Sequence, residues 1–274
     1  MNKKPILLTS PRPNASRRGR GRAWGAFGAL VCGLLIGGLL AVGSGTSASV
    51  GIAPCADRQI VVGMSSPERT PELQRFAVEV ATQAAVSAAV CGRDAEAFAV
   101  AGGGAVFSLL STDDVARFTP RGPNRAVRLA RLDPTMSRTI EALVAARLHR
   151  TYQADRTPTV SSIAALYEVA AEHAGPNNDV LMVTAGVNHD AQVNLNRPLP
   201  TGDGARLAAV VSIPKVANHV TTVVGIAQVD ATIPVPGPSW PDEIRAFNER
   251  VCRASGARRC RLFSVASVAD AFTP

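Results

Sequence analysis

Residues 57–70 read Asp-Arg-Gln-Ile-Val-Val-Gly-Met-Ser-Ser-Pro-Glu-Arg-Thr. Ile60, Val61 and Val62 form a short apolar run between polar residues, which indicates a buried strand. The chain then breaks at Gly-Met-Ser-Ser-Pro and enters a helix that we expect to begin near Pro71. In an open α/β sheet, ligands bind in the crevice outside the carboxyl ends of the strands. The stretch therefore predicts a fold class and the edge of the sheet at which a site would lie.

Strands and helices alternate along the rest of the chain. The helix expected over residues 71–90 has an apolar face, with Gln83 on the opposite, polar face. Residues 95–101 and 105–110 read as two strands joined by three glycines, which predicts an antiparallel hairpin. Residues 117–131 are basic and interrupted by Pro and Gly, and no element is predicted there. Alternation of this kind indicates a mostly parallel sheet.

The remaining expected elements are three strands and three helices. The strands are expected over 179–185, 220–229 and 260–267, and the helices over 133–153, 161–173 and 242–254. Asp133 is the expected cap of the first of these helices, and Ser161 or Ser162 that of the second.

The order of these elements and the loop after the first strand resemble von Willebrand factor type A (VWA) domains. In that family the loop reads Asp-x-Ser-x-Ser and binds a divalent cation, whereas here Gly63 and Pro67 occupy its first and last positions. The second motif of the family, a Thr, corresponds to Val160 or Ser161, and the third, an Asp, corresponds to Ala185. The resemblance implies a doubly wound, mostly parallel six-stranded sheet with helices on both faces, in a VWA-like domain over residues 57–274.

The positions that match the cation motifs have lost both carboxylates. Hard divalent cations need oxygen ligands, usually including a carboxylate. We therefore expect a degenerate site, at Gly63, Pro67 and Ala185, that holds no metal ion or other cofactor. The alternative is a rearranged metal-dependent adhesion site in which Glu68 or Asp190 supplies the missing carboxylate.

Six polar residues are expected at the carboxyl ends of the strands, and they are the candidate binding residues. They are Ser65, Ser66, Glu68, Asn188, His189 and Asp190. One interpretation is a polar patch that contacts another envelope protein. The other is structural, because Asn and Asp suit turns and Ser suits helix caps.

An enzyme is the competing functional class. Ser65 or Ser66 with His189 and Asp190 would supply a nucleophile, a base and an acid for a hydrolase. The loop Gly-Met-Ser-Ser-Pro does not match the nucleophile elbow Gly-x-Ser-x-Gly, however. His189 and Asp190 are also neighbours in sequence, which seldom lets the acid orient the base. We therefore expect a protein that is not an enzyme.

The N-terminal segment predicts a membrane anchor. Of the net charge of +8, residues 1–56 carry seven cations and no acid, and the rest of the chain carries 22 basic and 21 acidic residues. A nucleic-acid-binding protein concentrates its positive charge on the folded domain, so this partner is not expected. Residues 24–43 are uncharged and would span about 30 Å as a helix, the thickness of a bilayer core.

This assignment divides the chain into a basic cytoplasmic tail (1–23), a transmembrane helix (24–43), a linker (44–56) and an extracytoplasmic domain. Cleavage near Thr46-Ser47-Ala48 would instead release a secreted protein. Gly33 and Gly37 form a GxxxG pattern, which predicts weak self-association of the span.

Four of the five cysteines follow the predicted span, an even number that suits an oxidising compartment. The VWA resemblance places Cys55 and Cys91 before neighbouring strands, and Cys252 and Cys260 at the same rim. It thus implies the disulfides Cys55–Cys91 and Cys252–Cys260, with free buried thiols as the alternative.

The sequence as a whole favours a metal-independent protein-interaction or scaffold domain at a bacterial cell envelope. The high content of Ala, Gly, Val and Arg, with few Lys, is typical of high-GC bacteria such as actinobacteria. The partner is an envelope protein that the sequence does not identify, and a purely structural envelope domain is a further alternative.

Overall fold

The computed structural model describes residues 55, 58–64, 70–155, 161–228, 235–264 and 272. The chain divides into residues 1–48 and a second unit, Ser49–Pro274, and all described residues belong to the second. The predicted tail, membrane span and GxxxG pattern therefore lie outside the described residues. None of the helices in the described part of the chain combines the length and the apolar character that a membrane crossing needs.

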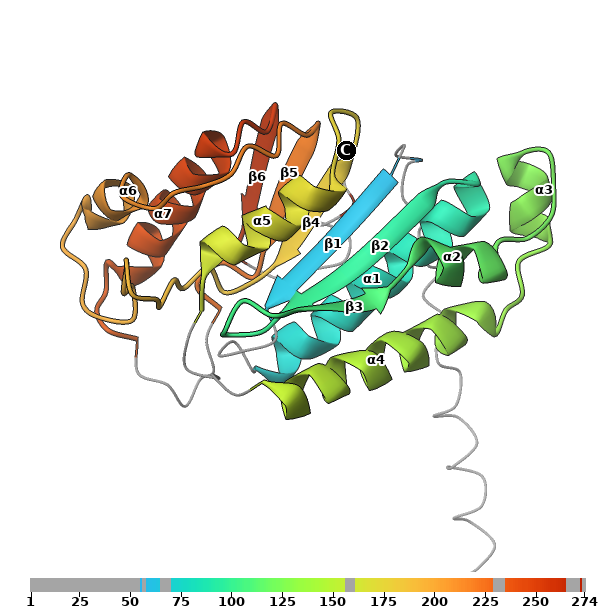
Figure 1. Cartoon of the computed structure of the whole chain (residues 1–274), viewed down its shortest axis with the longest axis horizontal. Coiled ribbons are helices and arrows are strands. Elements are labelled where there is room, and N and C mark those ends of the chain that lie inside the picture. The colour runs from blue at the N-terminus through green and yellow to red at the C-terminus, as the bar shows by residue number, and fades with distance from the viewer. Residues whose placement is uncertain are drawn as a thin grey trace, which may run out of the picture. The chain divides into compact units, whose positions relative to one another are not determined.

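The second unit is an α/β domain built on one six-stranded, mostly parallel sheet (Figure 1). The strand order is β3-β2-β1-β4-β5-β6, and only β3 runs antiparallel to its neighbour. The strands are β1 (Arg58–Met64), β2 (Asp94–Val100), β3 (Val106–Leu110), β4 (Asp179–Val183), β5 (Val220–Val224) and β6 (Arg259–Phe263). The predicted α/β fold with a mostly parallel six-stranded sheet is confirmed, and so is the predicted hairpin.

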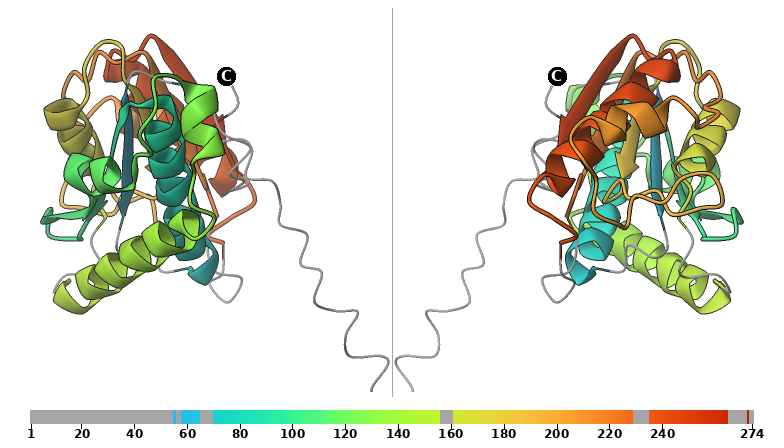
Figure 2. Two further views of the ribbon diagram at one scale, coloured as in Figure 1. Left: turned by 90° about the vertical axis from the view of Figure 1, so that its right-hand side faces the viewer. Right: turned by 90° about the vertical axis from the view of Figure 1, so that its left-hand side faces the viewer.

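Helices cover both faces of this sheet (Figure 2). One face carries α5 (Ile163–His173), α6 (Asp203–Ala208) and α7 (Trp240–Ala254). The other carries α1 (Pro71–Cys91) and α4 (Met136–Ala154), with α2 (Thr112–Phe118) and α3 (Arg125–Ala130) beside α1. Strand β1 lies between the layers: Ile60 and Val62 pack with the first group, and Val61 packs with the second.

Helix α1 is more deeply buried than its sequence pattern predicts. Its start is as expected, with Pro71 in the first turn and the Thr70 hydroxyl accepting a hydrogen bond from Leu73 N at 3.1 Å. Gln83, predicted to face solvent, is only 4% exposed, because α4 and the short helices pack beside α1 opposite the sheet. Its amide donates to the Ser87 hydroxyl at 3.5 Å.

Several element boundaries differ from the prediction. The helix expected from Asp133 begins at Met136, because the Asp133 carboxylate accepts hydrogen bonds from both the amide and the hydroxyl of Thr135 at 2.7 Å. Strand β5 ends at Val224, five residues before its predicted end, and the next residue is Gly225, whose φ of 93° favours glycine. A Cβ at Gly225 would also lie 2.5 Å from Leu73 Cδ2.

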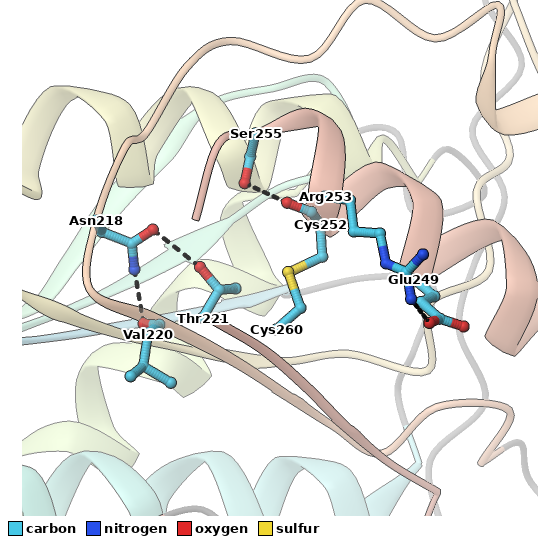
Figure 3. The surroundings of a disulfide bond; sticks show 8 residues. All are labelled: Asn218, Val220, Thr221, Glu249, Cys252, Arg253, Ser255 and Cys260. Carbon is cyan, nitrogen blue, oxygen red and sulfur yellow. Dashed lines mark hydrogen bonds and ion pairs between the residues drawn. A yellow bond between two sulfur atoms is a disulfide. The ribbon is translucent and has the colours of Figure 1, made fainter. Parts of the chain in front are cut away.

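Both predicted disulfides are present. Cys55–Cys91 joins the residue before β1 to the end of α1, with the Cα atoms 5.6 Å apart. Cys252–Cys260 joins α7 to β6, with the Cα atoms 6.1 Å apart (Figure 3). Both bridges lie at the amino edge of the sheet, where the parallel strands begin.

Candidate functional site at the carboxyl edge of the sheet

The loop after β4 is held in place by a buried side chain of α7. Asn248 is 2% exposed, and its Nδ2 donates to Gly186 O at 2.9 Å and to Ile244 O at 2.8 Å. Gly186 has a φ of 73°, and a Cβ at this position would lie 2.5 Å from Asn248 Nδ2. The loop therefore starts from a backbone position that α7 fixes and that only glycine suits.

Asn188, one of the predicted binding residues, is fully buried and hydrogen-bonded at both ends of its amide. Its Oδ1 accepts from Ile163 N at 2.8 Å, and its Nδ2 donates to Val193 O at 2.9 Å. Asn188 thus supplies the cap of α5 that Ser161 or Ser162 was predicted to supply. Ser162 does occupy the capping position, but its side chain makes no capping hydrogen bond.

His189 and Asp190 follow Asn188 and are partly exposed. The His189 backbone pairs with Ser161 through two hydrogen bonds, of 2.9 Å and 2.7 Å. The Asp190 Oδ1 accepts from Gln192 N at 2.8 Å and from Val193 N at 2.9 Å. In the described part of the chain these two side chains make no hydrogen bond or ion pair with each other. The loop therefore presents an imidazole and a carboxylate on a backbone that is held by several hydrogen bonds.

The positions that match the metal motifs of VWA domains are apolar or buried where the structure describes them. Ala185 is 2% exposed, and the Thr184 hydroxyl accepts a hydrogen bond from Gly186 N at 2.9 Å. Ser161 is fully buried, and its Oγ has no hydrogen-bond partner among the described residues. A Cβ on Gly63 would meet only ordinary contacts, the nearest with Val183 O at 3.6 Å. The described neighbours of Gly63 thus leave room for a Cβ atom at this position.

Three of the predicted site residues, Ser65, Ser66 and Glu68, lie outside the described residues, as does Pro67. The described residues contain no group of three or more His, Cys, Asp or Glu that could hold a metal ion. The predictions of a binding patch and of a site without metal therefore stay predictions.

Two polar residues with buried side-chain atoms at this edge were missed by sequence reasoning. Asn248 lies on the buried face of α7 beside Phe247 and Val251, and a polar residue in that position signals a specific hydrogen-bonding role. Gln228 follows β5 closely, and its buried Oε1 has no partner among the described residues. The sequence carries no comparable signal for it.

A separate groove of about 440 Å³ lies between α6 and α7. Three alanines and three charged residues line it: Ala205, Ala246, Ala254, Glu249, Arg250 and Arg253. Arg253 and Glu249 form an ion pair with each other (Figure 3). The groove is on the exposed face of α7, away from the predicted site residues.

The strand order and the single antiparallel edge strand agree with the α/β architecture expected from the sequence, but they identify no family. No model of a protein family matches the chain, and a search of curated proteins finds no match either.

Proposed function

We propose that the domain of residues 57–274 binds another protein of a bacterial cell envelope, outside the cytoplasm and without catalysing a reaction. The observation that carries the proposal is the loop of residues 186–195, which is pinned by α5 and α7 and presents His189 and Asp190 to solvent. A loop that is already ordered loses little conformational entropy when a partner binds it.

The geometry of the same loop favours binding over hydrolysis. A general base needs a partner that orients it, and the Asp190 Oδ1 is instead bonded to amides of its own loop. The hydroxyl of Ser161, adjacent to His189 in the backbone pairing, is buried beyond the reach of a substrate. A hydrolase would have to rely on Ser65 or Ser66.

The location outside the cytoplasm is supported by the disulfides. All four cysteines that follow residue 32 are paired, and such pairing is typical of proteins in oxidising compartments.

Lys215 offers a direct test of this location, because it is the only lysine after residue 4 and it is exposed. A membrane-impermeant amine reagent added to intact cells should label it, with Lys215→Arg as the control. Labelling that requires cell lysis would contradict the proposal.

Protein binding is tested by placing a photo-crosslinking amino acid at His189, at Asp190 and, as a control, at Arg250 on α7. We expect a discrete protein adduct in cells from His189 or Asp190 that Arg250 does not give. Identical adducts at all three positions, or none, would reject the site. A hydrolytic activity of the purified chain that His189→Ala abolishes would favour the enzyme instead.

A further inference from the structure

The second unit contains an arginine-rich segment that the candidate site does not use. Residues 115–132 hold five arginines and no acidic residue. Of these, Arg117, Arg121, Arg125 and Arg131 are exposed, and Leu129 beside them is 44% exposed. Helix α3, which belongs to this segment, contributes no buried residue. The segment is thus a basic surface with an apolar residue on it, which we call the arginine segment.

The fifth arginine, Arg128, fastens this segment to the end of α1. Its Nε donates to Val90 O and its Nη2 to Cys91 O, both at 2.7 Å, while its Nη1 donates to Gly122 O at 2.9 Å. These bonds satisfy carbonyls at the helix C-terminus, where a cation is also favoured by the helix dipole. The arginine segment is therefore fixed at the amino edge of the sheet. In Figure 1 this is the upper right side, where β1 begins and where α3 lies beside α1.

The chain enters the domain at the same place. Cys55 is bonded to Cys91, the residue whose carbonyl Arg128 contacts. Residues 44–54 separate this point from the predicted span and number 11. A chain of 11 residues reaches at most about 38 Å when fully extended. A membrane anchor over residues 24–43 would thus keep the arginine segment within reach of the bilayer surface.

We infer that the arginine segment contacts the anionic lipid headgroups of the membrane in which the chain is anchored. This inference rests on the membrane span predicted over residues 24–43 and on the proposed extracytoplasmic location. Guanidinium groups bind phosphate through two parallel hydrogen bonds, and each cation near an anionic surface adds about fivefold to binding. The partly exposed Leu129 suits the boundary between headgroups and acyl chains. The lipid contact would hold the carboxyl edge of the sheet away from the membrane.

The test uses the full chain in nanodiscs made of phosphatidylcholine alone or with about one third phosphatidylglycerol. Amide hydrogen exchange of residues 117–131, measured by mass spectrometry, should slow by about fivefold or more in the anionic discs. The variant Arg121→Glu with Arg125→Glu should lose this difference, and so should the wild-type chain in high salt. Arg206→Glu with Arg250→Glu makes the same charge change on α6 and α7 and should keep it. Arg128 stays intact, because it caps α1.

Equal exchange in the two kinds of disc would overturn the inference, as would loss of the difference in the control variant. Protection by soluble polyphosphate but not by anionic discs would assign the surface to a different polyanion. Failure of the chain to remain in the discs would remove the tether on which the inference rests. The protein-binding proposal is judged separately, since crosslinking at His189 or Asp190 can fail while lipid-dependent protection persists.

Discussion

Replacement of Asn188 by alanine separates a structural role of the site loop from a binding role. The substitution deletes the acceptor for Ile163 N and the donor to Val193 O, and both of these residues are at most 2% exposed. Ile163 N is then left without a partner, which costs about 1–3 kcal/mol, whereas Val193 O keeps a hydrogen bond from Asp190 N at 3.1 Å, so the loss of its second donor costs about 0.5–1.5 kcal/mol. The expected loss in the free energy of unfolding is therefore about 1.5–4.5 kcal/mol, a large part of the stability of an ordinary domain.

The assay is urea unfolding of the unit Ser49–Pro274, followed by circular dichroism. His189→Ala is the matched control: its side chain is partly exposed and makes no hydrogen bond or ion pair with another described residue, so we expect a change within about 0.5 kcal/mol. Asn188→Asp keeps the acceptor for Ile163 N but sets a carboxylate against Val193 O. Protonation restores a donor, so the stability of this variant relative to wild type should improve as the pH falls towards about 4.

A loss below about 1 kcal/mol for Asn188→Ala, with an unchanged dependence on urea, would refute this reasoning. It would mean that water or a shift of the backbone replaces both hydrogen bonds without strain. Asn188 would then be free to act with His189 and Asp190 at a binding surface, as the sequence predicted. A large loss would restrict the binding surface to the two partly exposed residues.

Three further predictions concern the packing around the sheet. Burial raises the pKa of Asp114, but hydrogen bonds, the largest from Arg147, outweigh it and lower this pKa to about 2. The ionised Asp114 therefore stabilises the folded state fully above pH 3.8, and this stabilisation is lost as the pH falls towards 2. Asp114→Asn lacks the titrating carboxyl, so its free energy of unfolding should fall less than that of wild type over the same pH range. In Gly204→Ala the new Cβ would lie 2.0 Å from a carbonyl oxygen of α7, so urea unfolding should show a loss of about 2–3 kcal/mol in the free energy of unfolding. Gly237→Ala is the control, because a Cβ there would meet nothing within 4 Å, and it should show almost no loss. Arg128→Ala should cost about 2–4 kcal/mol in the same assay, and Arg128→Lys should recover less than half of it because lysine lacks the planar fork.

The main architecture could be predicted because its signals are local. The apolar run of Ile60 to Val62 and the glycines at 102–104 mark a buried strand and a hairpin without any knowledge of the rest of the chain. The disulfide pairing came instead from the strand order that the VWA resemblance implied, in which Cys55 and Cys91 precede neighbouring parallel strands.

The parts that could not be predicted depend on distant partners. Helix α6 begins where the amides of Gly202 and Gly204 donate to the carboxylate of Glu243, 39 or more residues away. Gln83 reads as a surface residue until α4 is placed beside α1. Short helices of six or seven residues carry too few repeats for a periodic pattern to reveal them.

The candidate site illustrates the same limit. Asn188 was correctly placed in the loop after β4, but its role depends on Ile163, which lies 25 residues earlier in the chain. A polar residue next to a turn has the same sequence signature whether it faces solvent or caps a buried helix. Burial and hydrogen bonds decide between the two roles, and both come from the tertiary structure.

The parallel sheet itself gives the proposed functions a common geometry. Because β1, β2, β4, β5 and β6 run in one direction, the amino edge gathers the chain entry, both disulfides and the arginine segment. The loop with His189 and Asp190 leaves from the opposite edge, at the end of β4. A domain tethered through Cys55 and resting on its arginines would therefore present that loop away from the membrane, towards partners in the envelope. Lipid contact and protein contact would then be coupled. Charge reversal in the arginine segment would release the domain from the membrane surface, and the loop would no longer be held in the orientation in which it meets its partner.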